Sequence, residues 1–176
     1  MKRNKHKAFR VMIATWLLIS AWTAAEPEGR AVDDLGKILD FSLKDVNGEM
    51  VSLNDFQGKR MLINFWATWC VPCLTEMPIL QEIHNQWIEK GLVVISINMG
   101  ESESKVRGFV QRHGLSFPVL LDPNTQVFIK HEIRELPTTL LVDKDKTIIA
   151  KKVGLFLSKE SLETELLRPA FGKDTP

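Results

Sequence analysis

The chain of 176 residues contains two cysteines, Cys70 and Cys73, separated only by Val71 and Pro72. A dithiol with this spacing at the start of a helix can close on itself with little backbone movement. The helix N-terminus would favour a thiolate on the first sulfur, so Cys70 could attack a substrate disulfide. Cys73 could then resolve the mixed disulfide. The spacing therefore indicates redox chemistry, with metal ligation or a structural disulfide as the alternatives.

Hydrophobic patterning predicts the elements that position the two thiols. Residues 61–66 (MLINFW) form an apolar run that ends just before the cysteines, which is typical of a buried strand. A helix is expected after Cys70, with Pro72 in its first turn and Gly91 at its end. The other expected elements are a hairpin at 41–53, a strand at 92–97, a helix at 104–113, a strand at 117–121, a hairpin at 139–153 and a helix at 159–167.

This order of elements predicts an α/β fold in which helices flank a central mixed sheet. The composition, 44% hydrophobic and 26% charged, suits one globular domain with a substantial core. The cysteines would then lie in the loop at the carboxyl end of a parallel strand, where α/β proteins place their binding sites.

Residues 1–25 have the pattern of an export signal or membrane anchor. Five basic residues precede the first acidic residue, Glu26, and residues 11–25 carry no charge. Fifteen uncharged residues are short for a membrane span, and the small residues at 23–25 offer a cleavage site. Trp16 and Trp22 instead suit an uncleaved anchor. Because the basic flank stays in the cytoplasm, the rest of the chain should lie on the extracytoplasmic side. We expect this part to consist of a linker at 26–36 and a domain at 37–172.

The charge balance disfavours a nucleic-acid partner. The 23 basic and 22 acidic residues sum to +1, but five of the basic ones lie before Glu26, so the rest of the chain carries −4. No basic surface is implied for the domain. The acidic run at residues 101–104 (ESES) is interpreted as a solvated helix N-terminus that Ser104 could cap.

Residues 65–73 (FWATWCVPC) resemble the active-site segment of the thioredoxin superfamily. The added pattern of Glu76 and Pro78 after the second cysteine, with the N-terminal apolar segment and hairpin, is similar to the ResA/TlpA-like extracytoplasmic thiol-disulfide oxidoreductases. The resemblance runs from about residue 38 to residue 171. It implies a thioredoxin-like fold with an extra N-terminal β-hairpin, no metal, and no cofactor other than a redox-active Cys70–Cys73 disulfide.

The resemblance also implies a proton carrier beside the thiols. Many thioredoxins carry a buried aspartate in the strand before the cysteines, but this chain has Asn64 there, and an amide cannot exchange protons. Glu76 lies one helical turn beyond Cys73, and burial would raise its pKa into a useful range. From the sequence alone, the favoured interpretation of Glu76 is a favourable charge near the start of a helix.

A second segment, residues 135–139 (ELPTT), carries Pro137 just before a predicted strand. The resemblance implies a cis proline that lies against the disulfide and leaves the preceding backbone free to pair with an extended substrate. From the sequence alone, a trans proline at the start of a strand is favoured. Trp66 could line the site or belong to the core. The residues expected to dock the substrate are Trp69, Val71, Pro72, Leu136 and Thr138.

The implied activity is reduction of disulfides in extracytoplasmic proteins such as apocytochrome c, whose thiols must be free for haem attachment. A membrane thiol-disulfide carrier would supply the electrons. The dithiol chemistry alone does not determine whether the protein reduces or oxidises its partner, because the reduction potential and the available partner set the direction of electron transfer. Two alternatives share the fold. One is a peroxiredoxin-like peroxidase, but its usual Pro-x-x-x-Thr/Ser-x-x-Cys segment has no match before Cys70. The other is a copper carrier, which usually has three residues between its cysteines where this chain has two.

Overall fold

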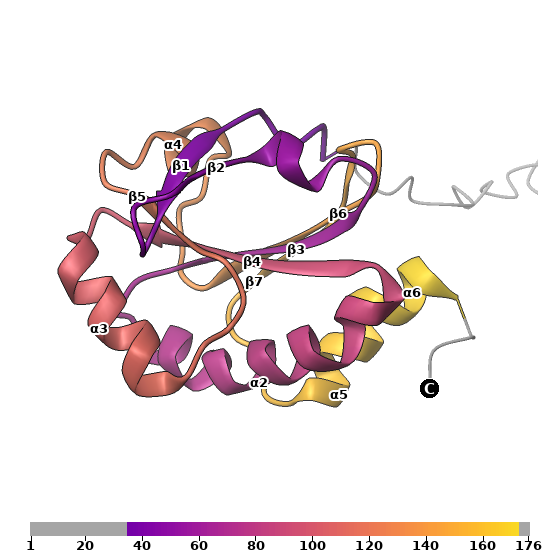
Figure 1. Cartoon of the computed structure of the whole chain (residues 1–176). Coiled ribbons are helices and arrows are strands. Elements are labelled where there is room, and N and C mark those ends of the chain that lie inside the picture. The colour runs from indigo at the N-terminus through magenta and orange to yellow at the C-terminus, as the bar shows by residue number, and fades with distance from the viewer. Residues whose placement is uncertain (1–34, 173–176) are drawn as a thin grey trace, which may run out of the picture. The chain divides into compact units, whose positions relative to one another are not determined.

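The computed structural model shown in Figure 1 describes residues 35–172 of the chain. The predicted export segment and nearly all of the predicted linker lie outside these residues. Within residues 35–172, no helix is both long enough and apolar enough to cross a membrane.

One mixed sheet of seven strands, in the order β2-β1-β5-β4-β3-β6-β7, forms the centre of the described region. β3 pairs in parallel with β4 and antiparallel with β6, and β4 also pairs in parallel with β5. The predicted mixed sheet and N-terminal hairpin are therefore confirmed. The strands are β1 (Ser42–Asp45), β2 (Met50–Ser52), β3 (Arg60–Trp66), β4 (Leu92–Met99), β5 (Val119–Asp122), β6 (Thr138–Val142) and β7 (Ile148–Val153).

The predicted helices are present, with two differences at their ends. α2 ends at Trp87 and a 3-10 turn continues to Gly91, which has a left-handed backbone (φ 83°). The expected cap at Ser104 is wrong, because Ser102 occupies the N-cap position of α3. The helices are η1 (Leu53–Phe56), α2 (Val71–Trp87), η2 (Ile88–Lys90), α3 (Glu103–His113), α4 (Gln126–Lys130), α5 (Lys159–Leu162), the π-helical η3 (Glu163–Leu167) and α6 (Arg168–Phe171).

The sheet is covered on both faces, as Figure 1 shows, with α2, α3 and α5 on one side and α4 on the other. Alternate residues of β3 enter the two hydrophobic layers: Leu62 and Trp66 pack beneath α2, whereas Ile63 and Phe65 pack beneath α4. This explains why five of the six residues at 61–66 are apolar, with Asn64 as the exception. Trp66 is fully buried in the layer that also contains both cysteines, so it belongs to the core.

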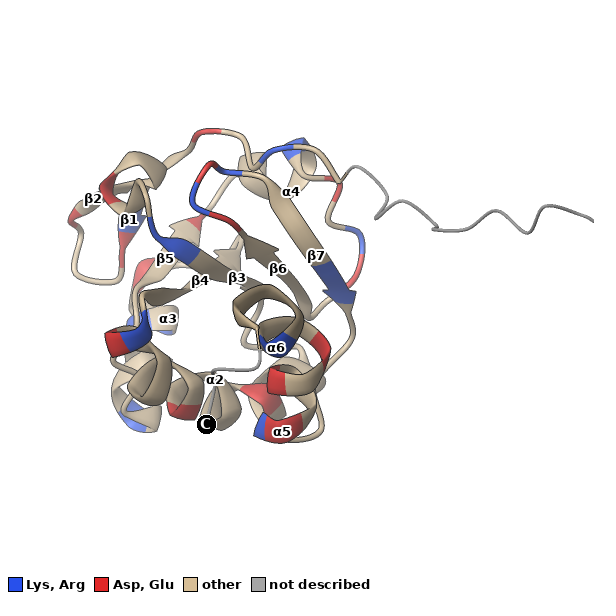
Figure 2. Cartoon of the chain, turned by 90° about the vertical axis from the view of Figure 1, so that its right-hand side faces the viewer, with Lys and Arg blue, Asp and Glu red and all other residues tan. Residues whose placement is uncertain are grey.

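Charged residues of both signs lie on the loops, helices and outer strand in the view of Figure 2. Two ion pairs join neighbouring elements of the fold. Lys152 on β7 contacts Glu165 of η3 (Nζ to Oε2, 2.6 Å), and Arg60 at the start of β3 contacts Asp143 just after β6 (Nε to Oδ1, 2.8 Å). Lys152 also contributes to the electrostatics of the site described below.

The short helix α4 was not predicted, because five residues are too few to show a helical period. It is held by Asp122, the buried last residue of β5. One carboxylate oxygen of Asp122 accepts the backbone N–H of Gln126 (2.9 Å), and the other accepts those of Val127 and Phe128 (2.8 and 3.2 Å). A carboxylate that lies only four to six residues before these N–H groups thus holds a helix that is too short to show a hydrophobic period.

We expect Asp122→Ala to lower the free energy of unfolding by about 2–4 kcal/mol, because it leaves backbone donors in a buried region without their charged acceptor. Urea unfolding of the oxidised protein measures the loss. Asn124→Ala, at an exposed position of the same turn, is the control and should change stability by less than about 0.5 kcal/mol. Equal stabilities for the two variants would show that Asp122 does not hold α4.

Candidate active site

Cys70 and Cys73 form a disulfide at the N-terminus of α2, with their Cα atoms 5.3 Å apart. Cys70 is the N-cap residue, and its Sγ accepts a hydrogen bond from the backbone N–H of Cys73 (3.3 Å). The dithiol thus follows the carboxyl end of β3, as predicted. The same N–H could stabilise a thiolate on Cys70 once the disulfide is reduced.

The two sulfurs differ in their access to the surface. Cys73 is completely buried, whereas Cys70 lines an open groove of about 510 Å³, which we call the Cys70 groove. Trp69 and Val71, on either side of Cys70, are 62% and 70% exposed. A partner can therefore approach only Cys70 directly. The other residues that line this groove are Pro72, Met99, Phe128, Ile133, Arg134, Glu135 and Leu136.

Pro137 follows a cis peptide bond, as the resemblance implied. Leu136 lines the Cys70 groove, which brings the segment before β6 beside the dithiol. Thr138 is instead buried and donates its hydroxyl to the carbonyl of Glu135 (2.7 Å), so its side chain is not available for docking. The predicted docking residues that do line the groove are Trp69, Val71, Pro72 and Leu136.

Glu76 lies on the buried side of α2, one turn beyond Cys73, and is 1% exposed. Burial raises the pKa of its carboxyl to about 8, although the backbone of Phe156 and the charge of Lys152 act in the opposite direction. Neither carboxyl oxygen has a hydrogen bond of normal geometry within the described region. The alternative of a solvated charge near the helix start does not fit this burial.

The other buried polar groups nearby do not provide a proton carrier. Asn64 on β3 is completely buried and donates its amide N–H to Thr139 on β6 (Nδ2 to Oγ1, 3.1 Å). Among the buried carboxylates of residues 35–172, Asp122 holds α4 and Glu163 accepts the indole N–H of Trp87 (3.2 Å). Glu76 is thus the buried carboxyl that shares a helix with the dithiol.

Glu101 is a site residue that the sequence did not reveal. The prediction of a solvated run at residues 101–104 is wrong for this residue, whose side chain is 6% exposed. Burial alone would raise its pKa, but hydrogen bonds from Lys105, Thr68 and Asn98 outweigh that effect and lower the pKa to about 2. The contact with Thr68 joins residues 33 positions apart, so no local pattern could indicate it.

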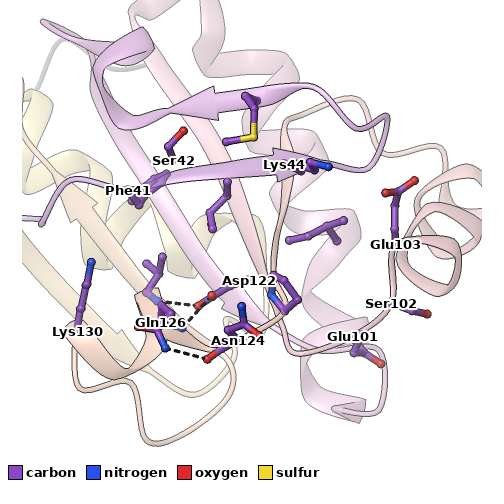
Figure 3. A pocket seen from close by; sticks show the side chains of 15 residues that line it. Phe41, Ser42, Lys44, Glu101, Ser102, Glu103, Asp122, Asn124, Gln126 and Lys130 are labelled. Carbon is purple, nitrogen blue, oxygen red and sulfur yellow. Dashed lines mark hydrogen bonds between the residues drawn. The ribbon is translucent and has the colours of Figure 1, made fainter.

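A further pocket of about 540 Å³ lies between the N-terminal hairpin and the loops after β4 and β5. Figure 3 shows its labelled side chains, including Lys44, Glu103 and Asp122. Neither cysteine lines it. This pocket is thus separate from the Cys70 groove, although Glu101 lies at its margin.

A disulfide that caps the helix after a central parallel strand, with a cis-proline segment beside it, defines a thioredoxin-like oxidoreductase. The AhpC/TSA family matches residues 36–151 of this chain. The thiol-disulfide oxidoreductase ResA of Bacillus cereus is 38% identical to this chain over 123 residues, which cover 70% of each protein. The ResA protein of Geobacillus kaustophilus is 34% identical, and the match covers 94% of this chain and 97% of that protein. The chain belongs to the AhpC/TSA family and is a thiol-disulfide oxidoreductase of the ResA type.

A solved structure supports the fold. A putative thiol:disulfide interchange protein DsbE from Chlorobium tepidum superposes with a TM-score of 0.71 at 28% identity, covering 78% of this chain and 97% of that one. The thioredoxin-like fold predicted from the resemblance is therefore confirmed.

The buried Glu76 predicts an unusual pH dependence of stability. Between pH 4.5 and about 8 the folded protein keeps the proton on Glu76, whereas the unfolded chain releases it, so stability falls as the pH rises. The loss attributable to this residue is at most about 5 kcal/mol, since one pKa unit corresponds to about 1.4 kcal/mol. Glu76→Gln should remove it, so the variant gains stability over the parent as the pH rises.

Urea unfolding of the oxidised proteins at pH 5 and pH 8.5 measures this difference. Glu82→Gln, at an exposed position of the same helix, is the matched control and should follow the parent at both pH values. A stability difference between Glu76→Gln and the parent that does not change with pH would contradict a raised pKa.

Proposed function

We propose that this protein is an extracytoplasmic reductant of protein disulfides that serves cytochrome c maturation. Its client would be oxidised apocytochrome c, and a membrane thiol-disulfide carrier would supply its electrons. Residues 1–25 would anchor the domain to the membrane or direct its export. The observation that carries the proposal is the order of the groups in the site: Cys70 lines the groove, whereas Cys73 and Glu76 are buried behind it.

This order suits a two-step exchange. The Cys70 thiolate attacks one sulfur of the client disulfide, that S–S bond breaks, and the other client sulfur leaves as a thiolate that takes a proton from water. Cys73 then attacks the Cys70 sulfur while its own proton passes to Glu76 in its ionised form, which is the minority form below about pH 8 and becomes the main form above it. The second client sulfur leaves and is protonated, the Cys70–Cys73 disulfide forms, and two electrons have passed to the client.

The pKa of Glu76 supports its part in the second step. A proton moves most readily between groups of similar pKa, and a value of about 8 lies close to that of an ordinary thiol, about 8.5. A solvent-exposed glutamate would be roughly four units away. Burial therefore turns a weak base into one matched to Cys73.

The surface around Cys70 supports a protein client. Trp69 and Val71 present exposed apolar surface on both sides of the nucleophile, and such patches mark interaction sites. The cis-proline segment lies along the same groove through Leu136. An extended client segment placed there would bring its disulfide to Cys70.

Cys73→Ser should trap the first intermediate, because Cys70 remains able to attack but nothing resolves the product. With an oxidised peptide that contains Cys-x-x-Cys-His, we expect one mixed disulfide at Cys70, detected by mass spectrometry without reductant. Cys70→Ser is the control and should form none. If Cys73→Ser captures no peptide, apocytochrome c is not the client.

The reduction potential tests the direction of transfer. We expect the Cys70–Cys73 couple of the full chain to lie near or below about −270 mV, the range of reductants supplied by thioredoxin. Equilibration with defined thiol buffers and alkylation of the free thiols gives the value. A potential approaching about −120 mV would instead identify an oxidant of exported proteins.

A further inference from the structure

Glu101 joins the loop after β4 to the turn that carries the nucleophile, residues 67–70, which we call the active-site turn. One oxygen of Glu101 accepts the backbone N–H of Thr68 (2.6 Å), and the other accepts the Thr68 hydroxyl (2.6 Å). A carboxylate that engages both donors of one residue fixes its backbone as well as its side chain. Figure 3 shows Glu101 beside Ser102 and Glu103, on the approach to α3.

The carboxylate is itself firmly held. Asn98 donates its amide N–H to Oε2 (2.9 Å), and the Lys105 ammonium lies 2.6 Å from Oε1. Asn98 is in the register position of β4 opposite Trp66, the last residue of β3. Glu101 is therefore anchored to the end of the central strands, where the active-site turn begins.

Glu101 and α2 hold different parts of the active-site turn. Cys70 is secured by the helix, through the Cys73 N–H, and by its own N–H to the Ala67 carbonyl (3.2 Å). Thr68 lies two residues before Cys70 and directly before the exposed Trp69. The contacts to Glu101 thus fix the backbone from which Trp69 projects.

We propose that Glu101 is a positioning residue for substrate docking: its carboxylate holds the active-site turn so that Trp69 stands beside the Cys70 groove ready for a protein partner. The inference rests on the proposed docking of a protein disulfide at this groove. Two tasks are then carried out by different parts of the site. α2 positions the reacting sulfur, and Glu101 positions the surface that recognises the partner. The low pKa of Glu101 keeps this contact intact at any pH where the protein acts.

Kinetics with a large and a small disulfide distinguish the two tasks. Without its anchor, the turn must be ordered each time a protein binds, so Glu101→Gln should raise the KM for insulin by about fivefold to tenfold. The rate with bis(2-hydroxyethyl) disulfide, which is too small to need Trp69, should change by less than about twofold. A purely structural defect would slow both substrates alike.

Three further variants sharpen the test. Thr68→Val removes the hydroxyl donor, so it should raise the KM for insulin as well, and the double variant should add little to Glu101→Gln because both changes break one contact. Glu103→Gln is the matched control, since its ion pair is to Arg107 and not to the active-site turn; it should behave as the parent.

The inference is overturned if Glu101→Gln has the same KM for insulin as Glu103→Gln, or if it slows the small disulfide as much as insulin. A parent protein that reduces the small disulfide but not insulin would contradict the proposed docking of proteins, which is a separate failure. All assays are made at a temperature at which every variant is folded.

Discussion

The pairing of β3 with β4 on one side and with β6 on the other is the constraint on which the site depends. Because β3 is buried on both faces, its register is fixed, and a shift by one residue would exchange its two sets of side chains. The register aligns Phe65 with Thr138, which directly follows Pro137. The strand that delivers the cysteines therefore also brings the cis-proline segment to them, although 64 positions separate Cys73 from Pro137.

The same burial determines which group can carry protons. Asn64 is held in the sheet by Thr139, and an amide has no useful pKa, so the strand provides no acid beneath the dithiol. α2 supplies the carboxyl instead, by turning Glu76 toward the layer that contains Cys73. Ionising a group in that layer is costly, and this cost to stability is what brings its pKa near that of a thiol. The loss of stability on ionising Glu76 and its proposed role as a proton acceptor therefore have the same physical cause, which is its burial.

Local features of the sequence were enough to predict β3, α2 and the dithiol, because a mostly apolar run and a C-x-x-C spacing depend on near neighbours. The cis bond at Pro137 and the proposed proton transfer by Glu76 needed the resemblance, since single-residue preferences favour a trans proline and a surface glutamate. α4 and Glu101 were missed for different reasons. α4 is too short to show a helical period, although the Asp122 carboxylate that holds it lies only four to six residues before the N–H groups it accepts. Residues 101–104 have the pattern of a solvated helix start, and only the fold brings Thr68, 33 positions away, to Glu101.

Glu76 and Glu101 show that donors, more than burial, decide how a carboxyl behaves beside this dithiol. Both side chains are largely removed from water, yet the pKa of one is about 8 and that of the other about 2. Glu101 receives four close contacts from Thr68, Asn98 and Lys105, whereas no group among residues 35–172 makes a hydrogen bond of normal geometry with the oxygens of Glu76. A carboxylate that is always ionised can hold a backbone turn but cannot exchange protons. One that lacks donors can exchange protons but cannot anchor a loop, so a site that needs both functions requires two carboxyls in opposite environments.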